Sequence, residues 1–130
     1  MAVTTSTFDV FDRTCRSRSA LENISGKWGA LTLGALGDGP LRFNRLRRRV
    51  VGISEKMLTQ TLRNLQRDGM VYRRASPANP PTVTYGLTPL GTEITTQVTA
   101  VLDVIARLTP DVLDARHHYD TRNCAGPGPT

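Results

Sequence analysis

The sequence predicts a mainly α-helical domain with one small β-hairpin, an α+β fold class. Apolar residues recur at the three- and four-residue spacing of helices over most of the chain. Two short β-branched and aromatic segments lie between a pair of short helical segments and one long one. Turns rich in glycine and proline separate these elements. The 130 residues, of which 38% are hydrophobic, suit one domain with a modest core.

The domain itself is expected to span residues 15–118. Residues 1–14 show no clean hydrophobic period, which is typical of a flexible N-terminal arm. Residues 119–130 end in glycine and proline and are expected to form a disordered tail. No run approaches the roughly 18 consecutive apolar residues of a membrane span, and we find no signal peptide. We therefore expect a cytoplasmic protein without membrane contact.

The first helical signals lie between residues 19 and 36. The segment from Ser19 to Glu22 fits a capping box, S-x-x-E, which predicts a short helix that starts there. The run from Trp28 to Leu36 is apolar on several sides, which favours a central helix buried by its neighbours. Residues 37–40, Gly-Asp-Gly-Pro, have strong turn chemistry and end this helix.

Two amphipathic segments, 41–51 and 55–68, follow and are separated by a tight turn. The inward residues would be Phe43, Leu46 and Val50 in the first and Leu58, Leu62 and Leu65 in the second. Gly52 allows the sharp turn, Ser54 is a good N-cap, and Gly69 suits the position after the second helix. This is the outline of a helix-turn-helix, although any antiparallel helix pair has a similar pattern.

The next segments predict a hairpin. Residues 71–74, Val-Tyr-Arg-Arg, are typical of a strand, and residues 82–85, Thr-Val-Thr-Tyr, of the strand that returns beside it. Residues 75–81 between them contain three prolines and are expected to form a loop. A helix-turn-helix followed directly by such a hairpin predicts a winged helix-turn-helix.

A long helix is predicted to begin at Thr88 and Pro89, as N-cap and first helical residue. Its apolar stripe consists of Ile94, Val98, Val101, Ile105, Leu108 and Val112. A stripe of this length favours burial against a second subunit, and therefore a homodimer. The alternative is that the helix packs only on its own domain.

Positive charge is concentrated in one window of the chain. The net charge is +6, yet residues 42–74 contain ten basic and two acidic residues, a net of +8. The rest of the chain contains seven basic and nine acidic residues, a net of −2. A basic patch of this kind is the electrostatic footprint of nucleic-acid binding; the alternative is a solvated face with no partner. On a winged-helix dimer it predicts double-stranded DNA as partner, with a pseudo-palindromic operator.

Base contacts are predicted from the second helix of the pair, on the side opposite its leucines. That side carries Lys56, Thr59, Gln60, Arg63 and Arg67 at helical spacing. Because residues near the N-terminus of such a helix reach base edges, we predict base readout by Lys56, Thr59 and Gln60. Gln60 could pair with adenine and Lys56 with guanine. Arg63 fits either base or backbone contact.

Contacts to the DNA backbone are predicted from the arginine-rich first helix and its surroundings. The residues are Arg42, Arg47, Arg48, Arg49, Ser54 and Arg67. Arg45 fits the same role or a solvated face. Arg73 and Arg74 lie at the base of the wing and point to opposite faces of their strand. One of them is therefore expected to contact the minor groove strongly.

Four stretches of the chain resemble the HxlR family of regulators. They are an N-terminal stretch with Cys15, Ala20, Leu21, Ile24 and residues 26–28, then residues 39–47, residues 52–60 and residues 80–91. Together they cover about residues 15–92, in order and with few gaps. The resemblance implies a bacterial transcription regulator, repressor or activator, which often controls a neighbouring gene. It also implies a dimer whose interface is built from the N- and C-terminal helices.

The chain departs from that family pattern at two positions. Arg16 stands where the family commonly has proline, and Arg45 stands where it commonly has glutamate. The change at Arg45 adds positive charge next to the expected DNA face. It should raise the affinity for any duplex, at some expense of selectivity.

The resemblance also implies a redox or electrophile sensor at Cys15, as some family members use this early cysteine. Arg13, Arg16 and Arg18 flank the thiol, and nearby positive charge favours the reactive thiolate. A disulfide to the Cys15 of a second subunit or to Cys124 could shift the spacing of the DNA half-sites. The alternative is that Cys15 is a small packing residue and Cys124 an inert thiol.

Other chemistry is not indicated by the sequence. Two cysteines outside any CxxC pair do not predict a metal site, and the neighbours His117 and His118 do not face one ion. We find no catalytic triad pattern, phosphate loop or carboxylate pair, and we expect no enzyme activity and no cofactor. A protein-interaction module on a winged-helix scaffold and a non-specific nucleic-acid-binding protein remain the alternatives.

Overall fold

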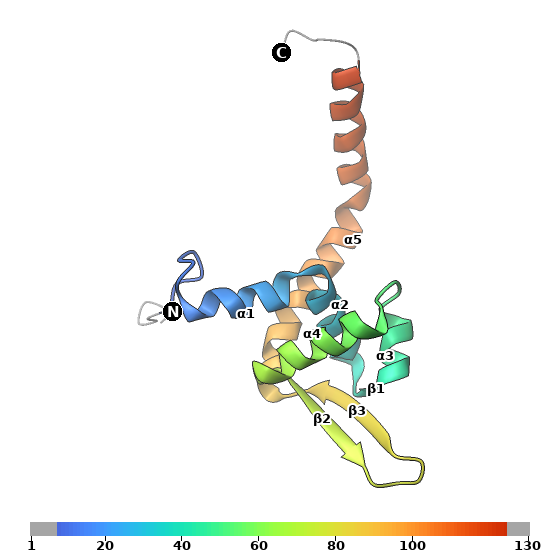
Figure 1. Cartoon of the computed structure of the whole chain (residues 1–130). Coiled ribbons are helices and arrows are strands. Elements are labelled where there is room, and N and C mark those ends of the chain that lie inside the picture. Colours follow the sequence, from blue (N-terminus) through green and yellow to red (C-terminus); the bar gives the residue numbers. More distant parts are fainter. Residues whose placement is uncertain (1–7, 125–130) are drawn as a thin grey trace. The chain divides into compact units, whose positions relative to one another are not determined.

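The computed structural model describes residues 8–124 of the chain. Its elements are α1 (Arg16–Ser25), α2 (Lys27–Ala35), η2 (Leu36–Asp38), β1 (Leu41–Arg42), α3 (Phe43–Arg49), α4 (Glu55–Arg67), β2 (Val71–Ser76), β3 (Thr82–Leu87) and α5 (Pro89–Cys124) (Figure 1). The chain forms two compact units, of which the first ends at Val98 and the second begins at Thr99. The fold is a winged helix-turn-helix of the α+β class, as predicted. Of the helices in the described range, none is long and apolar enough to cross a membrane.

The core of the first unit is built from the helix pair, its turn and the start of the hairpin. Its buried residues are Leu33, Leu36, Leu46, Val50, Ile53, Leu58, Leu62, Leu65, Met70 and Val71. The predicted inward positions of the helix pair are therefore confirmed, with Phe43 half-buried at the edge of this core. Ile94 and Val98 of α5 also pack against it, whereas Val101 and Ile105 are more than half exposed. The predicted apolar stripe of the long helix thus divides into a packed part and an exposed part.

The ends of α4 are held by the local chemistry that the sequence predicts. Gly52 has a φ of 94° in the turn before the helix. The Ser54 hydroxyl accepts a hydrogen bond of 3.0 Å from the backbone N–H of Met57, which caps the N-terminus. Gly69 has a φ of 77°, and its N–H donates to the carbonyl of Gln66 at 3.0 Å. These contacts fix where the helix begins and ends.

The sheet has three antiparallel strands in the order β1-β3-β2. The prediction placed Leu41 and Arg42 at the beginning of a helix, but they form β1, in register with Tyr85 and Thr84. A strand of two residues is too short to show alternation, and it exists because β3 supplies its hydrogen bonds. β2 also runs on to Ser76, so the loop of the wing begins later than expected.

Two helix boundaries differ from the prediction. α1 begins at Arg16 rather than at Ser19, because a turn in which the N–H of Cys15 donates to the carbonyl of Asp12 at 3.0 Å leads into it. Ser19 therefore lies inside the helix, and its hydroxyl donates to the carbonyl of Arg16 at 3.2 Å. At the other end, α5 continues to Cys124, with Pro110 inside it, and the glycines and prolines of the expected tail begin only at position 126.

Outside these elements, residues 8–15 are turns rather than regular structure. Residues 1–7 of the expected arm and residues 125–130 of the expected tail lie outside the described residues.

Candidate nucleic-acid interface

The solvent-facing side of α4 carries the residues predicted to read bases. Leu58, Thr61, Leu62 and Leu65 are buried on the inner side of this helix. The predicted stripe of Lys56, Thr59, Gln60, Arg63 and Arg67 is exposed throughout. One neighbour of this stripe was not predicted: the side-chain amide of Gln60 donates a hydrogen bond of 3.1 Å to Asn64 Oδ1, one turn further along the helix. This bond orients the Gln60 amide along the helix, and its i, i+4 spacing is visible in the sequence.

The arginines of α3 surround two shallow grooves. The first, which we call the wing groove, has a volume of about 770 Å³ and is lined by residues 40–45, Arg48 and residues 80–83. The second, the turn groove, has a volume of about 730 Å³ and is lined by Asn44, Arg47, Arg48 and residues 51–54. Asn44 and Arg48 line both grooves. Arg49 is exposed and lines neither.

The hairpin holds its two arginines on opposite faces. Arg73 is in register with Tyr85, on the side of the sheet that also carries buried Val71. On the other side the guanidinium of Arg74 lies 4.8 Å from the ring centre of Tyr72. The Tyr72 ring in turn lies over Gly86, where a Cβ atom would collide with it. Arg74 is thus held against the strand, whereas Arg73 has no such aromatic support among the described residues.

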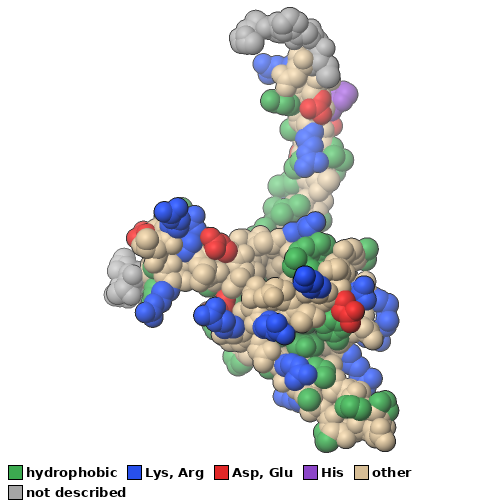
Figure 2. Space-filling view, in the orientation of Figure 1, with side chains coloured by type: hydrophobic (Ala, Val, Ile, Leu, Met, Phe, Trp, Pro, Cys, Tyr) green, Lys and Arg blue, Asp and Glu red, His purple; other side chains and the backbone are tan. Residues whose placement is uncertain are grey.

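Basic side chains gather on one face of the first unit, over α4 and beside α3 and the base of the hairpin (Figure 2). The single tryptophan lies beside the turn between α3 and α4. Gly52 approaches the Trp28 ring so closely that an added Cβ atom would be 3.8 Å from its Cη2 atom. Trp28 is half-buried, and the Lys27 ammonium lies 4.4 Å from its ring centre. Its fluorescence therefore reports on the turn between α3 and α4.

The HxlR-like helix-turn-helix family matches residues 23–112 of the chain, which include the helix-turn-helix, the hairpin and most of α5. The chain belongs to this family. It is 44% identical over 108 residues to the uncharacterized HTH-type transcriptional regulator YtfH of Escherichia coli, covering 83% of this chain and 86% of that protein.

Two solved structures show the same likeness to this HxlR-like chain. ytfH from Salmonella typhimurium has a TM-score of 0.80 at 44% identity, over 85% of this chain and 98% of that one. The redox regulator HypR in its reduced form has a TM-score of 0.68 at 34% identity, over 76% of this chain and 97% of that one.

Cys15 of this HxlR-like chain lies in a small polar network at the beginning of α1. Its half-buried Sγ accepts hydrogen bonds from the backbone N–H of Asp9 at 3.2 Å and from the Ser17 hydroxyl at 3.4 Å. These bonds, above all the one from Ser17, lower the pKa of the Cys15 thiol below its usual range, while burial and, less strongly, the negative charge of Asp12 oppose the shift. The expected direction is therefore right, but hydrogen bonds rather than flanking arginines cause it.

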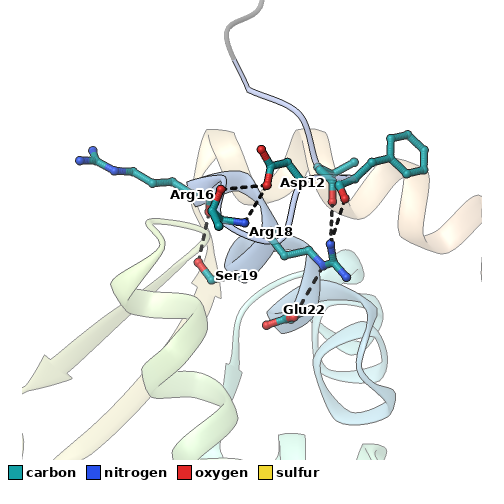
Figure 3. A network of polar contacts seen from close by, with 8 residues as sticks. Asp12, Arg16, Arg18, Ser19 and Glu22 are labelled. Carbon is teal, nitrogen blue, oxygen red and sulfur yellow. Dashed lines mark hydrogen bonds and ion pairs between the residues drawn. The ribbon is translucent and has the colours of Figure 1, made fainter.

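The flanking Arg18 is occupied elsewhere (Figure 3). Its guanidinium donates to the backbone carbonyls of Val10 at 3.3 Å and Phe11 at 3.4 Å, and lies 3.7 Å from the Glu22 carboxylate. Arg18 thereby fastens the N-terminal turns to α1. The side chain of Cys124, the other predicted thiol, lies outside the described residues.

The two histidines make contacts within their own helix. Nδ1 of His118 lies 2.8 Å from the carbonyl oxygen of Asp114, and its ring meets that of His117 edge-on with centres 6.2 Å apart. Within residues 8–124, no three His, Cys, Asp or Glu side chains lie together in a way that could hold a metal ion.

Proposed function

We propose that this HxlR-like protein is a transcriptional regulator that reads a duplex DNA operator and acts by binding rather than by catalysis. One observation carries the proposal: every residue of the polar stripe of α4 is exposed, and two grooves lined by arginines lie in the same helix-turn-helix. An α-helix fits the major groove, and polar side chains on its exposed side are the groups that read base edges there. Acting on the chromosome places the protein in the cytoplasm, in the nucleoid when it is bound.

The residue roles follow from position. Lys56, Thr59, Gln60 and Arg63 lie on the part of α4 that would enter the groove and are assigned to bases. Phosphates would be held by Arg42, Arg47, Arg48, Arg49, Ser54 and Arg67. Of the wing arginines, Arg73 is the better candidate for the minor groove, because Arg74 is already stacked on Tyr72.

A homodimer is proposed from the surface of the second unit. The exposed fractions of Val101, Ile105 and Leu108 are 57%, 55% and 40%, on one side of a helix. Burying these side chains against a second copy would remove apolar surface from water, which favours association. A two-fold dimer would match a pseudo-palindromic operator, with half-sites about one or more helical turns apart.

A redox response at Cys15 is proposed as the input signal. The lowered pKa of the thiol raises its thiolate fraction at neutral pH, and the thiolate is the form that oxidants and electrophiles attack. The similar redox regulator HypR, 34% identical, supports this role.

The test is fluorescence-anisotropy binding to the DNA upstream of the protein's own gene and to a shuffled duplex, at several salt concentrations and under reducing conditions. An advantage of about a thousandfold or more for one duplex is expected of an operator-reading regulator. Steep salt dependence without preference would instead indicate a non-specific binder. If the protein bound neither duplex at low salt, the DNA-binding proposal would be overturned and a protein-interaction module would be the remaining alternative.

A further inference from the structure

The apex of the wing has no positive charge of its own. Residues 75–83, Ala-Ser-Pro-Ala-Asn-Pro-Pro-Thr-Val, contain no lysine or arginine. An apex of this composition cannot hold a DNA strand by ion pairing. The cations of the wing groove come from β1 and α3, whose residues Arg42, Arg45 and Arg48 line it together with residues 80–83 of the wing.

These three arginines recur in the sequence at a constant spacing. They follow one another at three-residue steps, from the strand β1 along the N-terminal part of α3, so successive Cα atoms in the helix advance by about 4.5 Å. All three are exposed. The described residues that line the groove include no carboxylate to neutralise them. This part of the groove is therefore complementary to negative charge.

The wing contributes mostly apolar side chains to the groove. They are Pro80, Pro81 and Val83, with the polar Thr82 between them, and Phe43 also lines the groove. Phe43 packs against Tyr85 with ring centres 6.4 Å apart. Because β1 is paired with β3, both parts of the lining are attached to the same sheet. A groove lined by both cations and apolar carbon fits a chain of phosphates whose sugars present C–H groups.

We propose that the wing groove seats the sugar–phosphate backbone of one DNA strand, with Arg45 as a positioning residue for its phosphates. This inference rests on the proposed function. The wing then contributes mostly apolar contacts to deoxyribose, while the cations come from β1 and α3. Arg45, where the chain departs from the family pattern, supplies one of these three cations.

A small organic anion, such as an aromatic carboxylate, would meet the same lining. The position of the groove favours DNA. The wing groove shares Asn44 and Arg48 with the turn groove, which ends at Ser54, the N-cap of α4. The two grooves therefore form one basic track that leads from the wing to the helix proposed to read bases, and a DNA strand is long enough to follow it.

The experiment measures the binding of the full chain to its operator and to a shuffled duplex over a range of salt concentrations. Arg45→Ala is expected to weaken both complexes by about tenfold and to lower the salt slope by about one, with an unchanged specificity ratio. Arg45→Lys should restore most of the salt slope. Arg107→Ala, which removes the same charge from an exposed position on α5, is the matched control and should leave the slope unchanged.

Neutral methylphosphonate linkages, introduced one at a time into the operator, locate the phosphate. At one or two adjacent positions on one strand, we expect the neutral linkage to weaken DNA binding by the wild type. The same linkage should not weaken binding by Arg45→Ala any further. Equal effects on both proteins at every position would overturn the inference. Thermal unfolding of each variant should match the wild type.

The remaining outcomes separate this inference from the proposed function. If the wild type prefers its operator and Arg45→Ala binds DNA as Arg107→Ala does, the assignment of the wing groove is overturned. The proposed function as a DNA-binding regulator is then retained. If the wild type binds no duplex, both fall. Saturable binding of benzoate that is lost in Arg45→Ala, with DNA binding unchanged, would overturn the assignment in favour of a small-anion site.

Discussion

The side-chain amide of Asn23 donates a hydrogen bond of 2.9 Å to the carboxylate of Asp68. Asn23 lies on α1, a few residues after the Cys15 network, and Asp68 is the residue that ends α4. Both side chains are half-buried. The bond therefore connects the helix that carries the candidate sensor to the C-terminal end of the helix proposed to read DNA.

Replacing Asn23 with alanine is expected to lower the free energy of unfolding by about 1–3 kcal/mol, because a half-buried carboxylate loses its donor. Urea denaturation monitored by Trp28 fluorescence measures the change. The double variant Asn23→Ala, Asp68→Ala should recover part of the loss, since no unpaired carboxylate remains. Equal stability of the wild type and Asn23→Ala would show that the bond contributes nothing.

Gln60→Ala is expected to reduce the preference for the operator over a shuffled duplex by about tenfold or more, because a bidentate base contact provides about 1–3 kcal/mol of discrimination. Arg48→Ala should instead weaken all duplexes alike. Anisotropy titrations with both duplexes give the two quantities. Gln66→Ala removes the same side chain from an exposed position near the end of α4 and should retain the preference. A preference that survives in Gln60→Ala would remove this residue from the reading stripe.

The pKa of Cys15 should depend on Ser17. Because the Ser17 hydrogen bond is the largest cause that lowers this pKa, Ser17→Ala should raise the pKa, reduce the thiolate fraction at neutral pH and slow alkylation. The measurement is the pH dependence of the iodoacetamide reaction, with Cys124→Ser as background so that one thiol reacts. At high pH, where Cys15 is ionised both with and without the Ser17→Ala change, the alkylation rates of the two proteins should converge. A profile that does not move in Ser17→Ala would contradict the role of this hydroxyl.

Ile105→Glu is expected to convert the proposed dimer to a monomer, because a charge would have to be buried in the apolar surface of α5. Sedimentation velocity on the full chain measures the change, and operator affinity should fall with it. Ala106→Glu adds the same charge at the next position, which is also exposed and points to another side of the helix. It should leave the dimer intact. A wild type that sediments as a monomer, or an Ile105→Glu variant that remains dimeric, would exclude this face as the interface.

Local chemistry in the sequence determined most of the helix-turn-helix. The inward leucines of α4 repeat at helical spacing, and Ser54, Gly52 and Gly69 each act within three or four residues of their own position. The segregation of charge into residues 42–74 is likewise a property of the chain itself. Such features can be predicted from the sequence because the interacting groups are close together along the chain.

The tertiary structure alone decided the features that join distant segments. β1 exists because β3 pairs with it, and that pairing places Arg42 opposite Thr84, next to the residues 82 and 83 that line the wing groove with it. The pKa of the Cys15 thiol is lowered by hydrogen bonds that the fold of residues 9–17 provides. The guanidinium of the nearby Arg18 binds the carbonyls of Val10 and Phe11 instead of the thiol. Asn23 and Asp68 meet across 45 positions. No local pattern encodes such contacts, because their free energy is gained only when the core has brought separate elements together.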